Sequence, residues 1–382
     1  MMTRRLQAGF IASVLFWVSA QPPLAAQQIV IRGGQIFDAV RDRTVANSGI
    51  VVQSGKFLEV DARLEGRDLR EVEIVELSDD DYVIPGLFDL HAHYAMDLFG
   101  EGRVDEREGY PTLFLANGVT STFPGGEVDP EEMRDLRMRI DRGEAIGPRI
   151  FNSGPYFGSW RVGWNPDTST QQIFSEVDHW VEQGVRAFKA KGITAEHLRA
   201  LIERAHLHGA TVTGHLGSGF RGSVNPRDAI LMGIDRVEHF MGGDAFLGTQ
   251  SAYASLEAFD LDDATTVARL ERQARLFVEQ GAYFDATLTA YDYWAGKEAQ
   301  VYDYWEDERG FLTPFARAEV EQRLPRDPSD QFERIHYMKR RTIKLFYDAG
   351  GGDNISLGTD HPSWGEWWSG FGVHRELHAF VL

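Results

Sequence analysis

Cysteine is absent from this 382-residue sequence, and basic residues are scarce. The lack of cysteine excludes disulfide scaffolds, cysteine-ligated zinc sites and cysteine nucleophiles. Lys and Arg number 39 against 58 Asp and Glu, which gives a formal net charge of −19. Phosphate backbones are bound by clustered Lys and Arg, and the sequence has no long basic run. We therefore expect no nucleic-acid partner.

The apolar run from Gly9 to Ala20 is shorter than the roughly 20 residues that a membrane span requires. Arg4 and Arg5 precede this run, and the segment QPPLAAQQ follows it, which is typical of a secretory signal peptide. We therefore expect residues 1–26 to be a signal peptide, with a membrane anchor as the alternative. The mature protein is expected to be exported, periplasmic or secreted, and to have no stable membrane span.

Short segments rich in Ile and Val follow the expected signal peptide. They are separated by glycine-containing turns and cover residues 28–33, 49–55, 56–60 and 71–77. This pattern predicts a small β-domain over residues 27–82.

From residue 83 the pattern changes to strand-like segments that alternate with helix-like ones. We count eight strand-like segments, at residues 83–94, 118–123, 149–154, 186–192, 210–217, 235–240, 282–288 and 355–360. Such alternation predicts parallel strands joined by crossover helices. Eight strands suit a closed barrel with an active site at the carboxyl ends of the strands. The predicted fold class is α/β, a (β/α)8 TIM barrel over residues 83–382. A doubly wound sheet is the alternative, but no Gly-x-Gly-x-x-Gly motif follows the first strand.

Side chains that can bind a metal stand at the ends of these predicted strands. His91 and His93 end the first strand, and residues i and i+2 of a strand face the same side. Four more residues end the fourth, fifth, sixth and eighth strands, namely Lys189, His215, His239 and Asp360. Each alone could be a helix cap, a core histidine or an exposed charge. Together they predict a metal site on one ring, because an interior lysine is costly unless it is paired or modified.

The segments PGLFDLHAH, AFKAKG, VTGHLG, VEHF and LGTD resemble the amidohydrolase superfamily. They are most similar to the branch of imidazolonepropionase-like proteins and metal-dependent dipeptidases. The resemblance implies two metal ions at the mouth of the barrel. His91 and His93 would bind the more buried ion, and His215 and His239 the more exposed one.

The resemblance also implies that carbon dioxide carbamylates Lys189, so that the carbamate bridges both ions. Lys191 shares the strand parity of Lys189 and competes for this role. We favour Lys189 because it stands five residues after Gly184, as in the GxxxxK pattern of the family. Asp360 would bind the buried ion and act as the catalytic proton carrier.

These roles imply a hydrolase that cleaves amide, peptide or cyclic amide bonds with a metal-activated hydroxide. Zinc is the expected metal, although such ligands also accept manganese, cobalt or iron. The expected partner is a small molecule or short peptide, and a homo-oligomer is compatible with the sequence. Two alternatives stay open. One is a mononuclear deaminase of the same fold, which would lack the bridging lysine, and the other is a non-catalytic exported binding protein.

Aromatic residues crowd the predicted loops after strands three, seven and eight, and Tyr156 and Trp160 belong to the first of these loops. They either pack the loops or line an apolar pocket for the substrate. Arg161 and Arg221 lie in loops at the mouth and could anchor a substrate carboxylate, and Tyr94 could contact the substrate.

The sequence ends at HRELHAFVL, whereas members of the resembling family continue into further strands that complete the small β-domain. We therefore expect an incomplete last helix and a β-sandwich without its C-terminal strands, as in a truncated sequence or a variant. The missing strands would leave a sheet edge open.

Overall fold

The computed structural model describes residues 28–46, 48–96, 104–105, 109–217, 223–243, 256, 259–290, 314, 330–361 and 370–382. The predicted signal peptide lies outside these ranges. The chain divides into two compact units, Met1–Pro85 and Gly86–Leu382. Within the described ranges, no helix is both long enough and apolar enough to cross a membrane.

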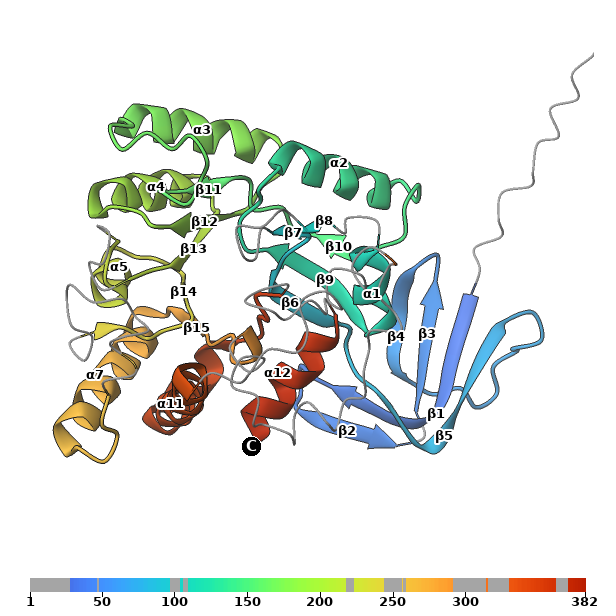
Figure 1. Ribbon diagram of the computed structural model, residues 1–382. Coiled ribbons are helices and arrows are strands. Elements are labelled where there is room, and N and C mark those ends of the chain that lie inside the picture. The colour runs from blue at the N-terminus through green and yellow to red at the C-terminus, as the bar shows by residue number, and fades with distance from the viewer. Residues whose placement is uncertain are drawn as a thin grey trace, which may run out of the picture. The chain divides into compact units, whose positions relative to one another are not determined.

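Five strands of the first unit form one mixed sheet (Figure 1). They are β1 (Gln28–Asp38), β2 (Arg43–Ala46), β3 (Gly49–Gln53), β4 (Lys56–Ala62) and β5 (Glu73–Val83). The path β2–β1–β3–β4 is antiparallel, and β5 pairs with β1 in parallel. The second layer that a sandwich requires is not found in the described part of this unit.

Parallel strands alternate with helices along the second unit (Figure 1). One sheet has the order β10–β9–β6, and the other has the order β11–β12–β13–β14–β15–β16. Their bounds are β6 (Leu87–Ala92), β9 (Val119–Pro124), β10 (Arg149–Ile150), β11 (Tyr156–Phe157), β12 (Ala187–Lys191), β13 (Thr211–His215), β14 (Arg236–Glu238), β15 (Tyr283–Asp285) and β16 (Ile355–Ser356). Each of the eight predicted strand segments overlaps one of these strands, and β11 is an additional short strand.

Eight α-helices lie in the described part of this unit, and several of them begin next to a capping side chain. They are α1 (Tyr110–Ala116), α2 (Pro130–Asp141), α3 (Thr170–Glu182), α4 (Ala195–Leu207), α5 (Pro226–Leu231), α7 (Ala264–Gln280), α11 (Asp330–Phe346) and α12 (Phe371–Val381). Ser169 and Gln172 form a capping box at α3, and the side chain of Thr194 caps α4. A short antiparallel ladder of β7 (Ala95–Met96) and β8 (Val104–Asp105) follows β6.

Two isolated parallel bridges add to the strand pairs, one between Ala92 and His361 and one between Glu127 and Pro155. Next to the first bridge, the N–H of Asp360 donates to the carbonyl oxygen of His91 at 2.7 Å. The segment after β16 therefore lies against the carboxyl end of β6. The fold is α/β and TIM-barrel-like, as predicted, while the pairing among the described strands forms two sheets rather than one closed ladder.

Two buried polar side chains from the last helices, those of Glu376 and Lys339, hold the loop that follows β15. Glu376 on α12 accepts hydrogen bonds from the backbone N–H groups of Leu288 and Thr289, both at 2.8 Å, and from the hydroxyl of Thr289 at 3.0 Å. Lys339 on α11 donates to the carbonyl oxygen of Thr287 at 3.2 Å. Helices that come late in the chain thus satisfy the buried polar groups of this loop.

We expect Glu376→Ala to lower the free energy of unfolding by on the order of 2–4 kcal/mol, because it leaves three buried donors without their acceptor. Glu279→Ala, on the exposed side of α7, is the matched control and should change stability by less than about 0.5 kcal/mol. Urea unfolding followed by circular dichroism measures both. Equal losses in the two variants would show that Glu376 does not anchor the loop.

Candidate metal centre

His91 and His93 extend from the end of β6 toward Asp360, which follows β16. Both imidazoles are buried, with exposed fractions of 1% and 3%. Nε2 of His93 lies 2.8 Å from Oδ1 of Asp360, and Nε2 of His91 lies 3.1 Å from the same oxygen. One ligand atom from each of the three residues lies within 4.8 Å of the others, so these residues could hold one ion.

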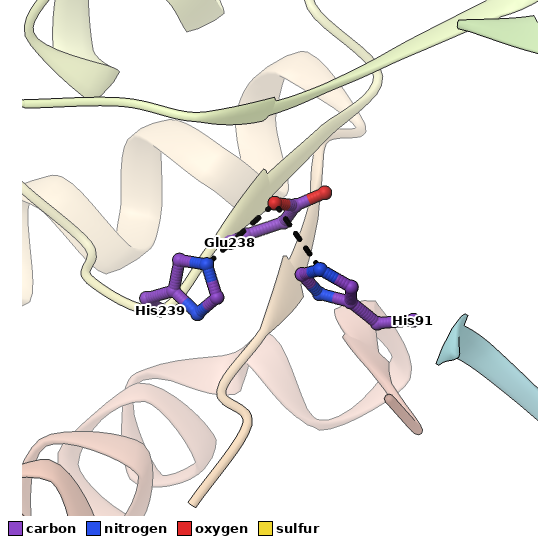
Figure 2. A group of neighbouring side chains, drawn as sticks. All are labelled: His91, Glu238 and His239. Carbon is purple, nitrogen blue, oxygen red and sulfur yellow. Dashed lines mark ion pairs between the residues drawn. The ribbon is translucent and has the colours of Figure 1, made fainter. Parts of the chain in front are cut away.

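A second donor group joins His91 to Glu238 and His239, at the end of β14 (Figure 2). Oε2 of Glu238 lies 3.8 Å from Nε2 of His91 and 3.7 Å from Nε2 of His239. The ring of His215, at the end of β13, stands edge-on to that of His239, with 4.4 Å between the ring centroids. Because His91 belongs to both donor groups, the two candidate ion positions are adjacent.

The two lysines of β12 have different surroundings. Nζ of Lys189 forms a buried ion pair with Glu238 and lies 3.0 Å from Nε2 of His91. Nζ of Lys191 lies over the ring of Trp160 instead, 4.2 Å from its centroid, and burial lowers its pKa to about 8. The geometry therefore favours Lys189 as the lysine of the metal centre.

Burial keeps three of the imidazoles neutral. It lowers the pKa of His93 to about 4. Burial, with Lys191 and Lys189 nearby, holds the pKa of His215 well below its usual range. Burial and the neighbouring His215 do the same to the pKa of His239. Neutral imidazole is the form that binds a metal ion.

The carboxylates of Glu238 and Asp360 are ionised. Burial raises the pKa of Glu238, but His91 and Lys189 outweigh this effect and lower that pKa to about 2. At Asp360 the histidines His91 and His93 outweigh burial in the same way and hold the pKa well below its usual range. Burial lowers the pKa of His91, yet Glu238 and Asp360 raise it to about 9. A cation held between these groups would replace that proton, so the donor set fits a divalent metal ion.

Hydrogen bonds at Nδ1 decide which ring nitrogen faces the centre. Oγ1 of Thr287 donates to the carbonyl oxygen of Ala286 at 2.8 Å, so it accepts from Nδ1 of His239 at 2.7 Å. Asp285 accepts from Nδ1 of His91 at 3.0 Å. In both rings Nδ1 carries the hydrogen, and in the neutral ring the lone pair is on Nε2, as a metal ligand requires.

Three residues at this rim have a left-handed backbone, namely His239 (φ 66°), Thr287 (φ 44°) and Asp360 (φ 59°). Such a backbone costs a residue other than glycine on the order of 1–3 kcal/mol. Regular strand alternation would send Glu238 and His239 to opposite faces of the sheet. The turn at His239 instead brings both side chains to one donor group (Figure 2).

All six predicted residues lie at this rim. Five are connected by the ion pairs and hydrogen bonds above, and His215 joins them through its ring contact with His239. Glu238 and Asp285, which are both fully buried, were not among the predicted ligands. The sequence signal that could have identified them is an acidic residue inside a short apolar strand, because a buried carboxylate requires a cation, a metal ion or hydrogen-bond donors.

Two residues predicted to contact the substrate have partners elsewhere. Arg161 forms an ion pair with Glu176 at 2.5 Å. The hydroxyl of Tyr94 is hydrogen-bonded to Thr122 at 2.8 Å, and this tyrosine belongs to the buried core. Arg221 and the aromatic residues predicted to follow strand seven lie outside the described residues.

A TIM-barrel-like unit with metal-capable side chains at the carboxyl ends of its strands is the architecture of a barrel enzyme. Residues 82–293, more than half of the chain, match the model of the amidohydrolase family. The chain belongs to the amidohydrolase family and is a hydrolase of amide or other C–N bonds. A non-catalytic binding protein is therefore not supported.

Solved structures of low sequence identity share the fold. A Xaa-Pro dipeptidase with bound methionine has a TM-score of 0.62 at 17% identity, covering 93% of this chain and 84% of that chain. Ochratoxinase from A. niger has a TM-score of 0.60 at 14% identity, with 94% and 81% covered. Molinate hydrolase has a TM-score of 0.59 at 17% identity, with 93% and 81% covered. No curated protein sequence matches the chain.

We expect Thr287→Val to weaken metal binding by about 10–100-fold, because it removes the acceptor that orients His239. Thr287→Ser keeps the acceptor and should stay within about threefold of the parent protein. Competition with a chromogenic chelator measures the affinity. Equal affinity in the valine and serine variants would contradict this role of the hydroxyl.

Proposed function

We propose that this chain is a metal-dependent hydrolase that cleaves amide, peptide or cyclic amide bonds with two divalent ions. The observation that carries the proposal is the pair of donor groups that share His91. The similarity to a Xaa-Pro dipeptidase supports short peptides as the first substrates to test. The pattern of the N-terminal segment supports an exported enzyme, periplasmic or secreted.

The donor group of His91, His93 and Asp360 supports one ion position, and the family pattern supports His215 and His239 as ligands of the other. His91, His93 and Asp360 would hold one ion, and His215 and His239 would hold the other. Zinc is the expected metal for such ligands. A carbamate on Lys189 would bridge both ions. Carbamylation would also replace the positive charge of Lys189 by a negative charge beside the carboxylate of Glu238. The two dications would then have to compensate both negative charges.

Bound at these ligands, the ions would supply an activated water and polarise the scissile carbonyl. Asp360 is ionised and lies at the rim, where it can take a proton from the attacking water at a carboxylate oxygen. It then passes this proton to the leaving nitrogen. Glu238 stays in place because it also accepts a hydrogen bond from Thr213 at 2.8 Å.

The buried ion pair of Lys189 and Glu238 favours a second candidate, a mononuclear deaminase of the same fold. If Lys189 remains an ammonium group, it already offsets the charge of Glu238. A single ion at His91, His93 and Asp360 would then complete the site, and the reaction would still break a C–N bond.

We expect about two zinc ions per chain after purification with zinc and ¹³C-labelled bicarbonate, together with a carbamate signal in the ¹³C NMR spectrum. Lys189→Met should remove the carbamate signal and about one ion, because the bridge is lost. Lys191→Met is the matched control on the same strand and should keep both. Elemental mass spectrometry counts the ions, and dipeptides, N-acyl amino acids and cyclic amides are assayed in parallel.

One ion per chain, no carbamate signal and an unchanged metal content in Lys189→Met would instead support the mononuclear deaminase. No metal at all in a folded chain would overturn both candidates.

A further inference from the structure

Lys191 is a cation at the edge of the metal centre that the proposed reaction does not use. It is the last residue of β12 and the register partner of His215 on β13. Its side chain is on the same face of the strand as that of Lys189. Within the described part of the chain, no carboxylate forms an ion pair with its ammonium group. Nζ lies over two aromatic rings, 4.2 Å from the centroid of Trp160 and 5.8 Å from that of Tyr156.

The segment that carries both rings is fixed against the end of β12. Tyr156 pairs with Lys189 in the sheet, and the N–H of Ser159 donates to the carbonyl oxygen of Gly192 at 3.1 Å. Gly158 has a φ of 129°, and a Cβ at this position would lie 2.2 Å from the carbonyl oxygen of Lys191. Glycine is therefore required for the close approach.

In this arrangement one exposed ring, that of Trp160, and one buried ring, that of Tyr156, lie beside a partly buried cation. Trp160 is 56% exposed, although tryptophan normally buries most of its surface, whereas Tyr156 is 5% exposed. A partly buried ammonium group beside aromatic rings gains only part of the stabilisation that water or an anion would provide. An anionic ligand at the open side of Trp160 would supply the remainder.

The charge of the protein also argues for an anion-binding residue. The formal net charge of −19 and the carboxylates of Glu238 and Asp360 would repel an anionic substrate. Arg161, the predicted carboxylate anchor on the same segment, is paired with Glu176. Among the residues that the structure describes, Lys191 at the edge of the metal centre is well placed to offset this repulsion.

We propose that Lys191, framed by Trp160 and Tyr156, binds the carboxylate of the substrate and selects dipeptides or N-acyl amino acids with a free carboxylate next to the scissile amide. This inference rests on the proposed amide hydrolysis at the adjacent metal centre. An apolar or aromatic side chain of the substrate would pack against the exposed face of Trp160.

The test uses the metal-loaded full chain with N-acetylphenylalanine and N-acetylphenylalanine amide as binding probes in calorimetry. Lys191→Met keeps the length of the side chain and removes its charge. We expect this variant to bind the acid more weakly by about tenfold to hundredfold and the amide within about twofold of the parent. Lys191→Arg should recover part of the acid binding. Lys344→Met, an exposed lysine on α11, is the control and should change neither.

Hydrolysis is measured in parallel on an Ala-Phe dipeptide and its C-terminal amide. The same preference should appear as a rise in KM for the acid in Lys191→Met, with kcat largely retained. Equal losses of activity on acid and amide, or no loss on either, would overturn the carboxylate role of Lys191. The proposed function would still stand in that case, because the peptides are hydrolysed. A lower metal content in Lys191→Met would also overturn it, because Lys191 would then belong to the metal centre. If neither peptide is hydrolysed, the proposed function fails, and the calorimetry still decides whether Lys191 binds the carboxylate.

Discussion

The buried pairing of Lys189 with Glu238 is the interaction on which the rest of the site depends. It joins β12 to β14 across the intervening strand β13, where Thr213 donates a hydrogen bond to the same carboxylate. Removing one member of a buried pair typically costs about 3–5 kcal/mol, because the other charge is left uncompensated. The pair also sets the state of its neighbours, since Glu238 contributes to the raised pKa of His91. Any bound metal must therefore enter a network whose charges are already balanced against one another.

The outer helices act on this network through the loop after β15. Glu376 on α12 holds Leu288 and Thr289, and Lys339 on α11 holds Thr287. Thr287 in turn orients the ring of His239. Helices far along the chain thus hold the loop whose Thr287 hydroxyl orients the imidazole of His239. The stability of the outer layer and the affinity for metal should be linked for this reason.

Much of the fold and the centre of the site could be predicted from periodicity. Each of the eight strand-like segments overlaps a strand of the structure, and His91 and His93, two residues apart, lie together at the end of β6. Regular strand geometry, in which alternate side chains share a face, accounts for these positions. It does not separate Lys189 from Lys191, which share strand parity, so the preference for Lys189 depends on its spacing from Gly184. Glu238 and Asp285 could not be assigned in the same way. Glu238 joins His239 only because the backbone turns to the left-handed region after β14, and Asp285 reaches His91 from a strand nearly 200 residues later.

The sequence by itself determined the alternation of strands and helices, the chemical types of the ligands and their places at the strand ends, because these follow from local spacing and from the cost of burying polar groups. Only the tertiary structure decided which donors meet, that Glu238 is the partner of Lys189, and that Lys191 faces aromatic rings rather than the metal ligands. The physical reason is that each of these contacts joins separate strands or loops, and its geometry depends on strand register and on a few unusual backbone angles rather than on neighbouring residues.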